Sequence, residues 1–233
     1  MLTTILAVLT AASAALFLSA HYLNLTLQLY IFKPLTMLFV ILNALLARRP
    51  VSPRYRTLIL LGLILSLAGD VLLILPSDQF VLGLVSFLLA HIVYIAAFRT
   101  GVEIPLSLPS TVPFIVFGIL ALAVLAPGLG QMALPVLAYV IVILVMAWQA
   151  LGRWRATRRT GDLLAFAGAL LFVLSDTVLA FNRFRFQFPA LDVVVWISYV
   201  AAQWLISQSV QAEPDSRVQP TRGPAGRAAV DSG

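Results

Sequence analysis

Eight long apolar segments dominate this chain of 233 residues and constrain its fold more than any other feature. Each is about 17–22 residues long, enough for an α-helix to cross the hydrocarbon core of a bilayer. Proline and glycine residues mark many of the joints between them. We therefore expect an all-α polytopic membrane protein with eight transmembrane helices. The segments are residues 2–19, 27–46, 57–75, 80–99, 110–126, 132–151, 161–182 and 189–210.

Composition supports this class and excludes several kinds of chemistry. The chain is 61% hydrophobic and only 10% charged, whereas soluble domains are about 25% charged. It has no cysteine, so disulfides and thiolate metal sites are excluded, and it has only two histidines, His21 and His91. We expect neither a metal nor an organic cofactor. The net charge of +6 comes from loop arginines, so we expect no nucleic-acid partner.

The loop arginines predict how the chain is oriented. In an eight-span arrangement only Arg183 and Arg185 lie on one side, and the positive-inside rule makes the other side, with the remaining arginines, cytoplasmic. We expect an integral protein of a bacterial cytoplasmic membrane with both termini in the cytoplasm. Residues 1–211 form the predicted transmembrane domain, and residues 212–233 read as a disordered cytoplasmic tail. The arginines on the cytoplasmic side are Arg48, Arg49, Arg54, Arg56, Arg99, Arg153, Arg155, Arg158, Arg159, Arg217, Arg222 and Arg227.

Two aspartates, Asp70 and Asp176, lie within the third and seventh apolar segments. Each follows a small residue, Gly69 or Ser175, and precedes a leucine three places later. A charged side chain at the bilayer centre costs roughly 2.5–3.5 kcal/mol on insertion scales, so such residues usually have a function. A matched pair suggests acid–base chemistry. The alternative is that each is only a helix–helix hydrogen-bonding group.

The two aspartates are 106 residues apart, and the same offset relates other polar positions. It maps Lys33 of the second segment onto Tyr139 of the sixth, and His91 onto Ile197. A parallel duplication of a four-helix unit would produce this pattern. Coincidence between leucine-rich helices is the alternative.

Polar side chains from several segments fall at a similar depth. At 1.5 Å per residue, Asp70 lies roughly 20 Å from the cytoplasmic end of its helix and Lys33 about 9 Å from the opposite end. We expect these side chains to line one cavity, although Lys33 could instead snorkel to the outer interface and His91 could be a packing donor. Pro34, next to Lys33, is expected to mark a break in the helix. Trp196 fits an aromatic belt at an interface. The candidate substrate-binding residues are Lys33, His91, Tyr94, Tyr139, Tyr199 and Gln203.

At these positions the chain resembles the YhhN-like lysoplasmalogenase family of integral membrane hydrolases. The resemblance extends over about residues 25–208. It rests on short motifs in order along the chain: Lys33-Pro34, Gly69-Asp70 with Leu73, Phe87 with His91 and Tyr94, Gly168-Ala169 with Phe172, Ser175-Asp176, Leu179-Ala180 with Phe184, and Tyr199 with Ala202 and Gln203. It implies an eight-helix enzyme that hydrolyses the vinyl ether bond of lysoplasmalogens, with Asp70 and Asp176 as candidate catalytic residues.

The chemistry of that reaction suits the two carboxyl groups. Protonation of the vinyl β-carbon gives an oxocarbenium ion, water adds, and the hemiacetal collapses to an aldehyde and an alcohol. The reaction needs a proton-donating acid and an anion, as glycosidases do. The expected partners are a lysophospholipid substrate and membrane lipids. A small proton- or ion-coupled transporter that uses the same Asp, Lys and His residues is the alternative function.

Overall fold

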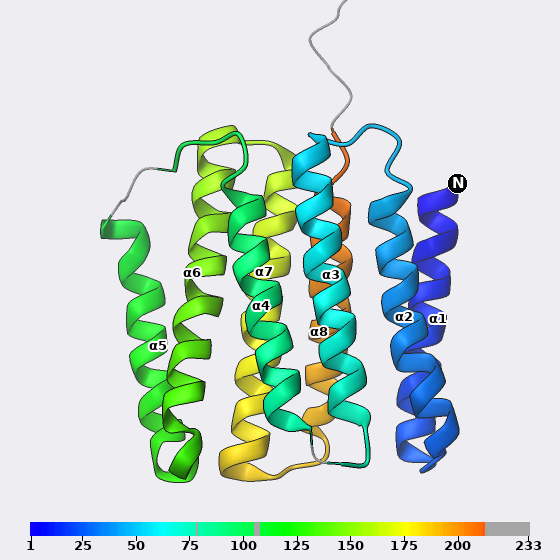
Figure 1. Ribbon diagram of the computed structural model, residues 1–233, viewed down its shortest axis with the longest axis vertical. Helices are drawn as coiled ribbons and strands as arrows, with labels where there is room; N and C mark the ends of the chain where they lie inside the picture. Colours follow the sequence, from blue (N-terminus) through cyan, green and yellow to red (C-terminus); the bar gives the residue numbers. More distant parts are fainter. Residues whose placement is uncertain (78, 105–107, 213–233) are drawn as a thin grey trace, which may run out of the picture.

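The computed structural model describes residues 1–77, 79–104 and 108–212, and this part of the chain is a bundle of roughly parallel and antiparallel helices (Figure 1). It contains no strand within those ranges, only an isolated bridge between Pro50 and Gln211. The expected all-α class is confirmed. The elements are α1 (Leu2–Tyr22), α2 (Thr26–Leu45), α3 (Pro53–Ile74), α4 (Phe80–Phe98), α5 (Leu108–Leu129), η1 (Gly130–Met132), α6 (Ala133–Thr157), α7 (Thr160–Phe181), η2 (Asn182–Phe186) and α8 (Leu191–Gln208).

Seven segments of the described chain are long and apolar enough to cross a membrane. The number is seven rather than eight because α5, η1 and α6 follow one another so closely that Pro109–Thr157 forms one segment of 49 residues. Within that segment the chain reverses direction, and α5 and α6 lie side by side as a hairpin (Figure 1). The length and the apolar composition of these helices are those of an integral membrane protein. The predicted tail lies outside the described residues, apart from Ala212, whose N–H donates to the carbonyl of Arg49 at 2.7 Å.

Most helices adjacent in the sequence pack against each other, but α4 packs against α6 rather than α5, and α8 also packs against α2. Gly62 and Gly168 each allow two helices to approach closely. A Cβ atom on Gly62 would lie 2.3 Å from the Tyr94 ring, so α3 can approach α4 only because Gly62 has no side chain. A Cβ atom on Gly168 would lie 2.8 Å from the carbonyl oxygen of Ala202, which fixes the contact between α7 and α8 in the same way.

Two residues differ from the sequence-based expectations. Trp196 does not lie in an exposed belt: it is 4% exposed, and its indole N–H donates to the carbonyl of Ala14 at 3.1 Å. It therefore joins α8 to α1. Pro34 does not break its helix, because α2 continues from Thr26 to Leu45 with the proline inside it. Proline removes one backbone donor, so the carbonyl of Tyr30, four residues earlier, has no Pro34 N–H to accept from.

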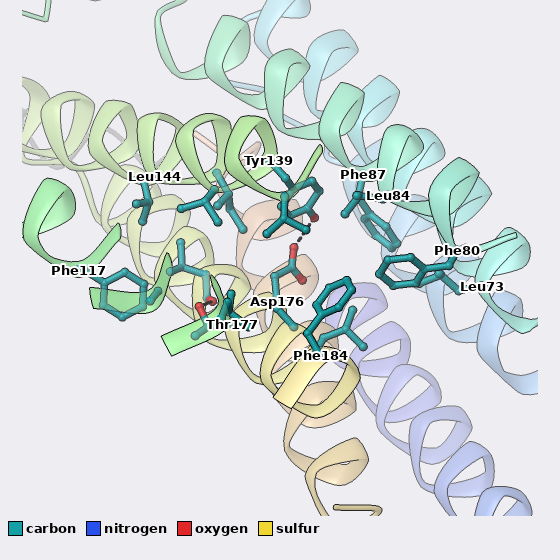
Figure 2. Close-up of a pocket in the computed structure, with 18 residues that line it drawn as sticks. Leu73, Phe80, Leu84, Phe87, Phe117, Tyr139, Leu144, Asp176, Thr177 and Phe184 are labelled. Atoms are coloured by element: carbon teal, nitrogen blue, oxygen red, sulfur yellow. Dashed lines mark hydrogen bonds between the residues drawn. The ribbon is translucent and has the colours of Figure 1, made fainter. Parts of the chain in front are cut away.

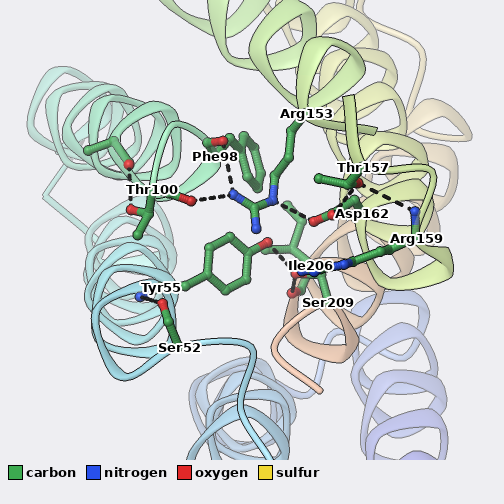
Figure 3. Close-up of polar contacts among 11 residues, drawn as sticks. Ser52, Tyr55, Phe98, Thr100, Arg153, Thr157, Arg159, Asp162, Ile206 and Ser209 are labelled. Atoms are coloured by element: carbon green, nitrogen blue, oxygen red, sulfur yellow. Dashed lines mark hydrogen bonds and ion pairs between the residues drawn. The ribbon is translucent and has the colours of Figure 1, made fainter. Parts of the chain in front are cut away.

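A buried ion pair joins several helices at the end of the bundle where the chain begins (Figure 3). Arg153 of α6 is 2% exposed, and its Nε donates to Asp162 of α7 at 2.5 Å. Its Nη1 donates to the carbonyls of Phe98, the last residue of α4, and Thr100, which follows the helix. Its guanidinium lies 4.5 Å from the ring centre of Tyr55 in α3. We call these five residues the Arg153 clasp. The expectation that Arg153 is an exposed loop arginine was wrong.

Candidate active site

Asp70 lies in a site made by three helices. Its side chain is buried, and Oδ1 lies 3.2 Å from Nζ of Lys33 on α2. The hydroxyl of Tyr199 on α8 donates to Oδ2 at 2.5 Å. Both carboxylate oxygens therefore have a partner, and one of the partners is a cation. Lys33 points inward to Asp70 and is 13% exposed, so it does not snorkel to the interface.

Asp176 has a different set of partners. The hydroxyl of Tyr139 on α6 donates to its Oδ2 (Figure 2). No ion pair to Asp176 is found among the described residues. Its neighbour Ser175 donates to the carbonyl of Val195 at 3.0 Å, which joins α7 to α8. Asp176 thus has a neutral partner, whereas Asp70 has a charged one.

One partner of each aspartate comes from the preceding helix and lies 37 residues earlier in the chain. For Asp70 this partner is Lys33, and for Asp176 it is Tyr139. These are the pairs that the offset of 106 residues relates to each other. Each aspartate therefore has a partner at the same sequence separation, but the partner of Asp70 is charged and that of Asp176 is neutral.

Both aspartates line a cavity of about 520 Å³, which we call the polar chamber. Its walls include the ends of α1 and α3, the starts of α2, α4 and α8, and η2. These helix ends lie at the opposite end of the bundle from the start of α1 (Figure 1). Lys33 and Tyr199 also line the chamber. A ligand would therefore meet both carboxyl groups within one space.

A second, narrower cavity of about 60 Å³ reaches Asp176 from the other side, and we call it the apolar slot. It is lined mainly by α4, α5, α6 and α7, and its lining is almost entirely aliphatic and aromatic (Figure 2). Leu73, Phe80 and Phe87 line both the slot and the chamber. Asp176 and Leu179 do so as well. Asp176 therefore lies where an apolar space and a polar space meet.

Three other predicted site residues, His91, Tyr94 and Gln203, are fully buried between the helices. Tyr94 donates to Oε1 of Gln203 at 2.9 Å, one helical turn beyond Tyr199 on α8. His91 is fully buried between the rings of Tyr139 and Phe172, with ring centres 5.3 and 4.6 Å away. Neither His91 nitrogen has a hydrogen-bond partner among the described residues. None of these three residues is among the described residues that line the chamber or the slot.

Sequence reasoning missed a group of polar side chains at the chamber rim. Asp192 accepts a hydrogen bond from Asn182 at 2.8 Å, and its Oδ2 lies 3.5 Å from Nε2 of His21. The guanidinium of Arg183 lies 5.0 Å from the ring centre of Phe80. Arg183 had appeared only as one of two arginines on the outer side. Its position seven residues after Asp176 was the available signal, because two helical turns return to the same face.

The residues around the two aspartates indicate what kind of site this is. Among the described residues, no three His, Asp or Glu side chains lie close enough together to hold a metal ion. What is present is an ion-paired carboxylate and a carboxyl group with a neutral partner, both inside an apolar helical bundle. Paired carboxyl groups in different surroundings are typical of acid–base hydrolysis. The molecule is thus an all-helical membrane protein with a two-carboxyl site.

Comparisons with known proteins agree with this class. The YhhN family model matches residues 28–210, and the chain belongs to this family. An Escherichia coli O6:H1 relative called uncharacterized membrane protein YhhN is 32% identical over 198 residues, covering 85% of this chain and 94% of its own length. Human lysoplasmalogenase TMEM86B is 34% identical over 173 residues, covering 70% and 67%. Bovine lysoplasmalogenase TMEM86A is 36% identical over 158 residues, covering 66% and 65%. No solved structure matches the chain.

Proposed function

We propose that this protein is a membrane hydrolase that cleaves the vinyl ether bond of lysoplasmalogen-type lysophospholipids. The observation that carries the proposal is the pair of carboxyl groups facing one chamber with different partners, Lys33 for Asp70 and Tyr139 for Asp176. The names of the mammalian relatives support the substrate class. The products are a fatty aldehyde and a glycerophospho compound.

Asp176 is the proposed general acid. Its proton goes to the β-carbon of the vinyl ether, and the electron pair of the double bond forms the new C–H bond. The adjacent carbon and the ether oxygen then share a positive charge. Tyr139 donates a hydrogen bond to the carboxylate that remains, and the fixed negative charge of Asp70 stabilises the cation.

The same groups complete the hydrolysis. Water adds to the carbon that bears the ether oxygen, and its proton returns to Asp176. The hemiacetal hydroxyl then gives up its proton and forms the aldehyde C=O bond, while the bond to the glycerol oxygen breaks and that oxygen takes up one proton to become the alcohol. Lys33 keeps Asp70 ionised in this scheme, and Tyr199 orients its carboxylate.

The Arg153 clasp favours a hydrolase over a transporter. It ties α3, α4, α6 and α7 together at the end of the bundle opposite the chamber. A transporter must open its site to both sides of the membrane, whereas a hydrolase needs access from one side only. The one-sided position of the chamber fits the second requirement.

We also infer eight membrane crossings in two parallel four-helix repeats, with both termini cytoplasmic. The segment Pro109–Thr157 is far longer than the roughly 20 residues that one crossing needs. The start of α1 and the end of α8 lie at the same end of the bundle (Figure 1). The packing of the first four helices also recurs in the last four. α2 packs against α3 as α6 packs against α7, and α3 packs against α4 as α7 packs against α8.

Purified protein in detergent should release fatty aldehyde from a lysoplasmalogen and leave the corresponding 1-acyl lysophospholipid intact. The reason is that an ester lacks the vinyl carbon that the acid protonates. Aldehyde is measured by coupling to an aldehyde dehydrogenase. If no aldehyde forms, and liposomes containing the protein instead show proton-driven solute uptake, the hydrolase proposal is wrong and the transporter is correct.

A further inference from the structure

We propose that the apolar slot binds the first part of the substrate's hydrocarbon chain, with the vinyl ether at Asp176 and the glycerophospho group in the polar chamber. This inference rests on the proposed function and adds to it where each part of the lipid lies. It starts from the position of Asp176, which lines both cavities. A single-chain ether lipid has the same order of parts: an apolar chain, a reacting bond and a polar group.

The walls of the slot fit a hydrocarbon chain. α5 contributes Phe117, Ala121 and Leu125, and α6 contributes Val136, Val140 and Leu144. Apart from Asp176, Tyr139 and Thr177, every described lining residue is apolar, and the Tyr139 hydroxyl is already bound to Asp176. Burial of each methylene in such a space contributes about 0.8 kcal/mol. A polar headgroup would gain no partner there beyond the two residues next to the reacting bond and Thr177.

The volume of the slot sets how much chain it takes. At roughly 10–15 Å³ for each water-sized group, a cavity of about 60 Å³ holds about five such groups. The rest of a long chain would continue past Phe117, which is 41% exposed on the outer face of α5. The end of the chain then lies among the bilayer lipids, and the slot recognises only the carbons next to the vinyl ether.

The polar chamber fits the other part of the lipid. Its volume of about 520 Å³ is much larger than that of the slot, and its lining includes Lys33 and Arg183. A glycerophospho group is anionic and has hydroxyls, so it suits the side of Asp176 that has charged and hydroxyl-bearing residues. The opposite placement would bury a phosphate among aliphatic side chains, which costs several kcal/mol.

The test replaces two alanines of one helix, one at a time, by phenylalanine. Ala121 is buried on the slot side of α5, whereas Ala123, two residues later, is exposed. Ala121→Phe should fill the slot, and Ala123→Phe adds the same ring on the outer face. Ala180→Leu, on the α7 wall, is a second blocking variant in case Ala121→Phe does not fold. Correct folding is checked by size-exclusion chromatography and thermal unfolding.

Each variant is measured with 1-hexadecenyl and 1-ethenyl lysophospholipids that share one headgroup. Loss of chain contacts should lower kcat/KM for the hexadecenyl substrate by about tenfold or more in Ala121→Phe. The ethenyl substrate has no chain beyond the reacting bond, so its kcat/KM in Ala121→Phe should differ from the wild-type value by less than about twofold. Ala123→Phe should resemble the wild type with both. Equal kcat/KM for the hexadecenyl substrate in Ala121→Phe, Ala180→Leu and wild type would overturn the inference.

A binding measurement separates this inference from the proposed function. A saturated 1-hexadecyl lysophospholipid cannot be cleaved, and its Kd can be measured by calorimetry in detergent even if the protein releases no aldehyde. Ala121→Phe should weaken its binding by about tenfold relative to Ala123→Phe. If the wild type releases aldehyde but this Kd is the same in both variants, the slot inference fails and the proposed function stands. If the Kd differs but no aldehyde forms, the slot binds the chain and the proposed function fails.

Discussion

Replacing either Asp70 or Asp176 by asparagine should lower the rate of aldehyde release by at least about 100-fold. Asparagine keeps the size of the side chain and can still accept one hydrogen bond. At position 176 it removes the proton that the acid donates. At position 70 it removes the negative charge beside Lys33. General acid catalysis alone contributes about 10²–10⁴-fold, and the loss of one electrostatic partner costs a similar amount.

The measurement is the initial rate of aldehyde formation by purified variants of equal folded yield. Glu103→Gln is the matched control, because Glu103 is an exposed carboxylate that lines neither the chamber nor the slot. It should retain most of the activity. The Asp70→Asn, Asp176→Asn double variant should be only slightly less active than the less active single variant, because groups that act as a unit are not additive. Near-normal rates in both single variants would mean that the carboxyl groups are structural.

Replacing Arg153 by methionine should destabilise the protein by about 3–5 kcal/mol. The substitution leaves the Asp162 carboxylate buried without its cation, and the carbonyls of Phe98 and Thr100 lose their donor. The hydroxyl of Thr157 still donates to Asp162, but a neutral donor does not replace a charge. For a chain of this size, the loss corresponds to a fall in Tm of roughly 10 °C.

Thermal unfolding in one detergent, followed by circular dichroism, measures this effect. Arg155→Met is the control, because Arg155 lies on the same helix but is exposed. It should change the Tm by less than about 2 °C, as exposed charges contribute little. Adding Asp162→Leu to Arg153→Met should recover part of the loss, since the unpaired charge is then gone. A Tm for Arg153→Met equal to that of Arg155→Met would show that the clasp does not stabilise the bundle.

Much of this fold could be predicted from the sequence because each membrane helix is encoded locally. A run of apolar residues between Pro53 and Ile74 must satisfy its own backbone hydrogen bonds, and only a helix does so. The break between α5 and α6 was predicted from Pro127 and Gly128, although the turn is so short that the two helices form one apolar segment of 49 residues. Pro34 was misread because packing against neighbouring helices holds α2 together around it.

The site was predictable where a residue was unusual in its own segment. Asp70 and Asp176 stood out because a carboxyl group is costly in a membrane helix, and the structure gives each a partner among the other candidates. Arg153 was missed because it lies near other arginines at a helix end, where an exposed charge is the normal expectation. The apolar slot was not predictable at all, since a space between helices depends on how four of them pack.

Isotope labelling of the products tests the central claim most directly. In D₂O, transfer of the exchangeable Asp176 proton to the vinyl β-carbon should place one deuterium at C2 of the released aldehyde. In H₂¹⁸O, the glycerophospho product should contain no ¹⁸O, because water adds to the vinyl carbon and the glycerol oxygen stays with its own carbon. Asp176→Asn should form the deuterated aldehyde only at the background rate. Formation of ¹⁸O-labelled glycerophospho product by the wild type, or full activity in Asp176→Asn, would contradict protonation of the vinyl ether by this carboxyl group.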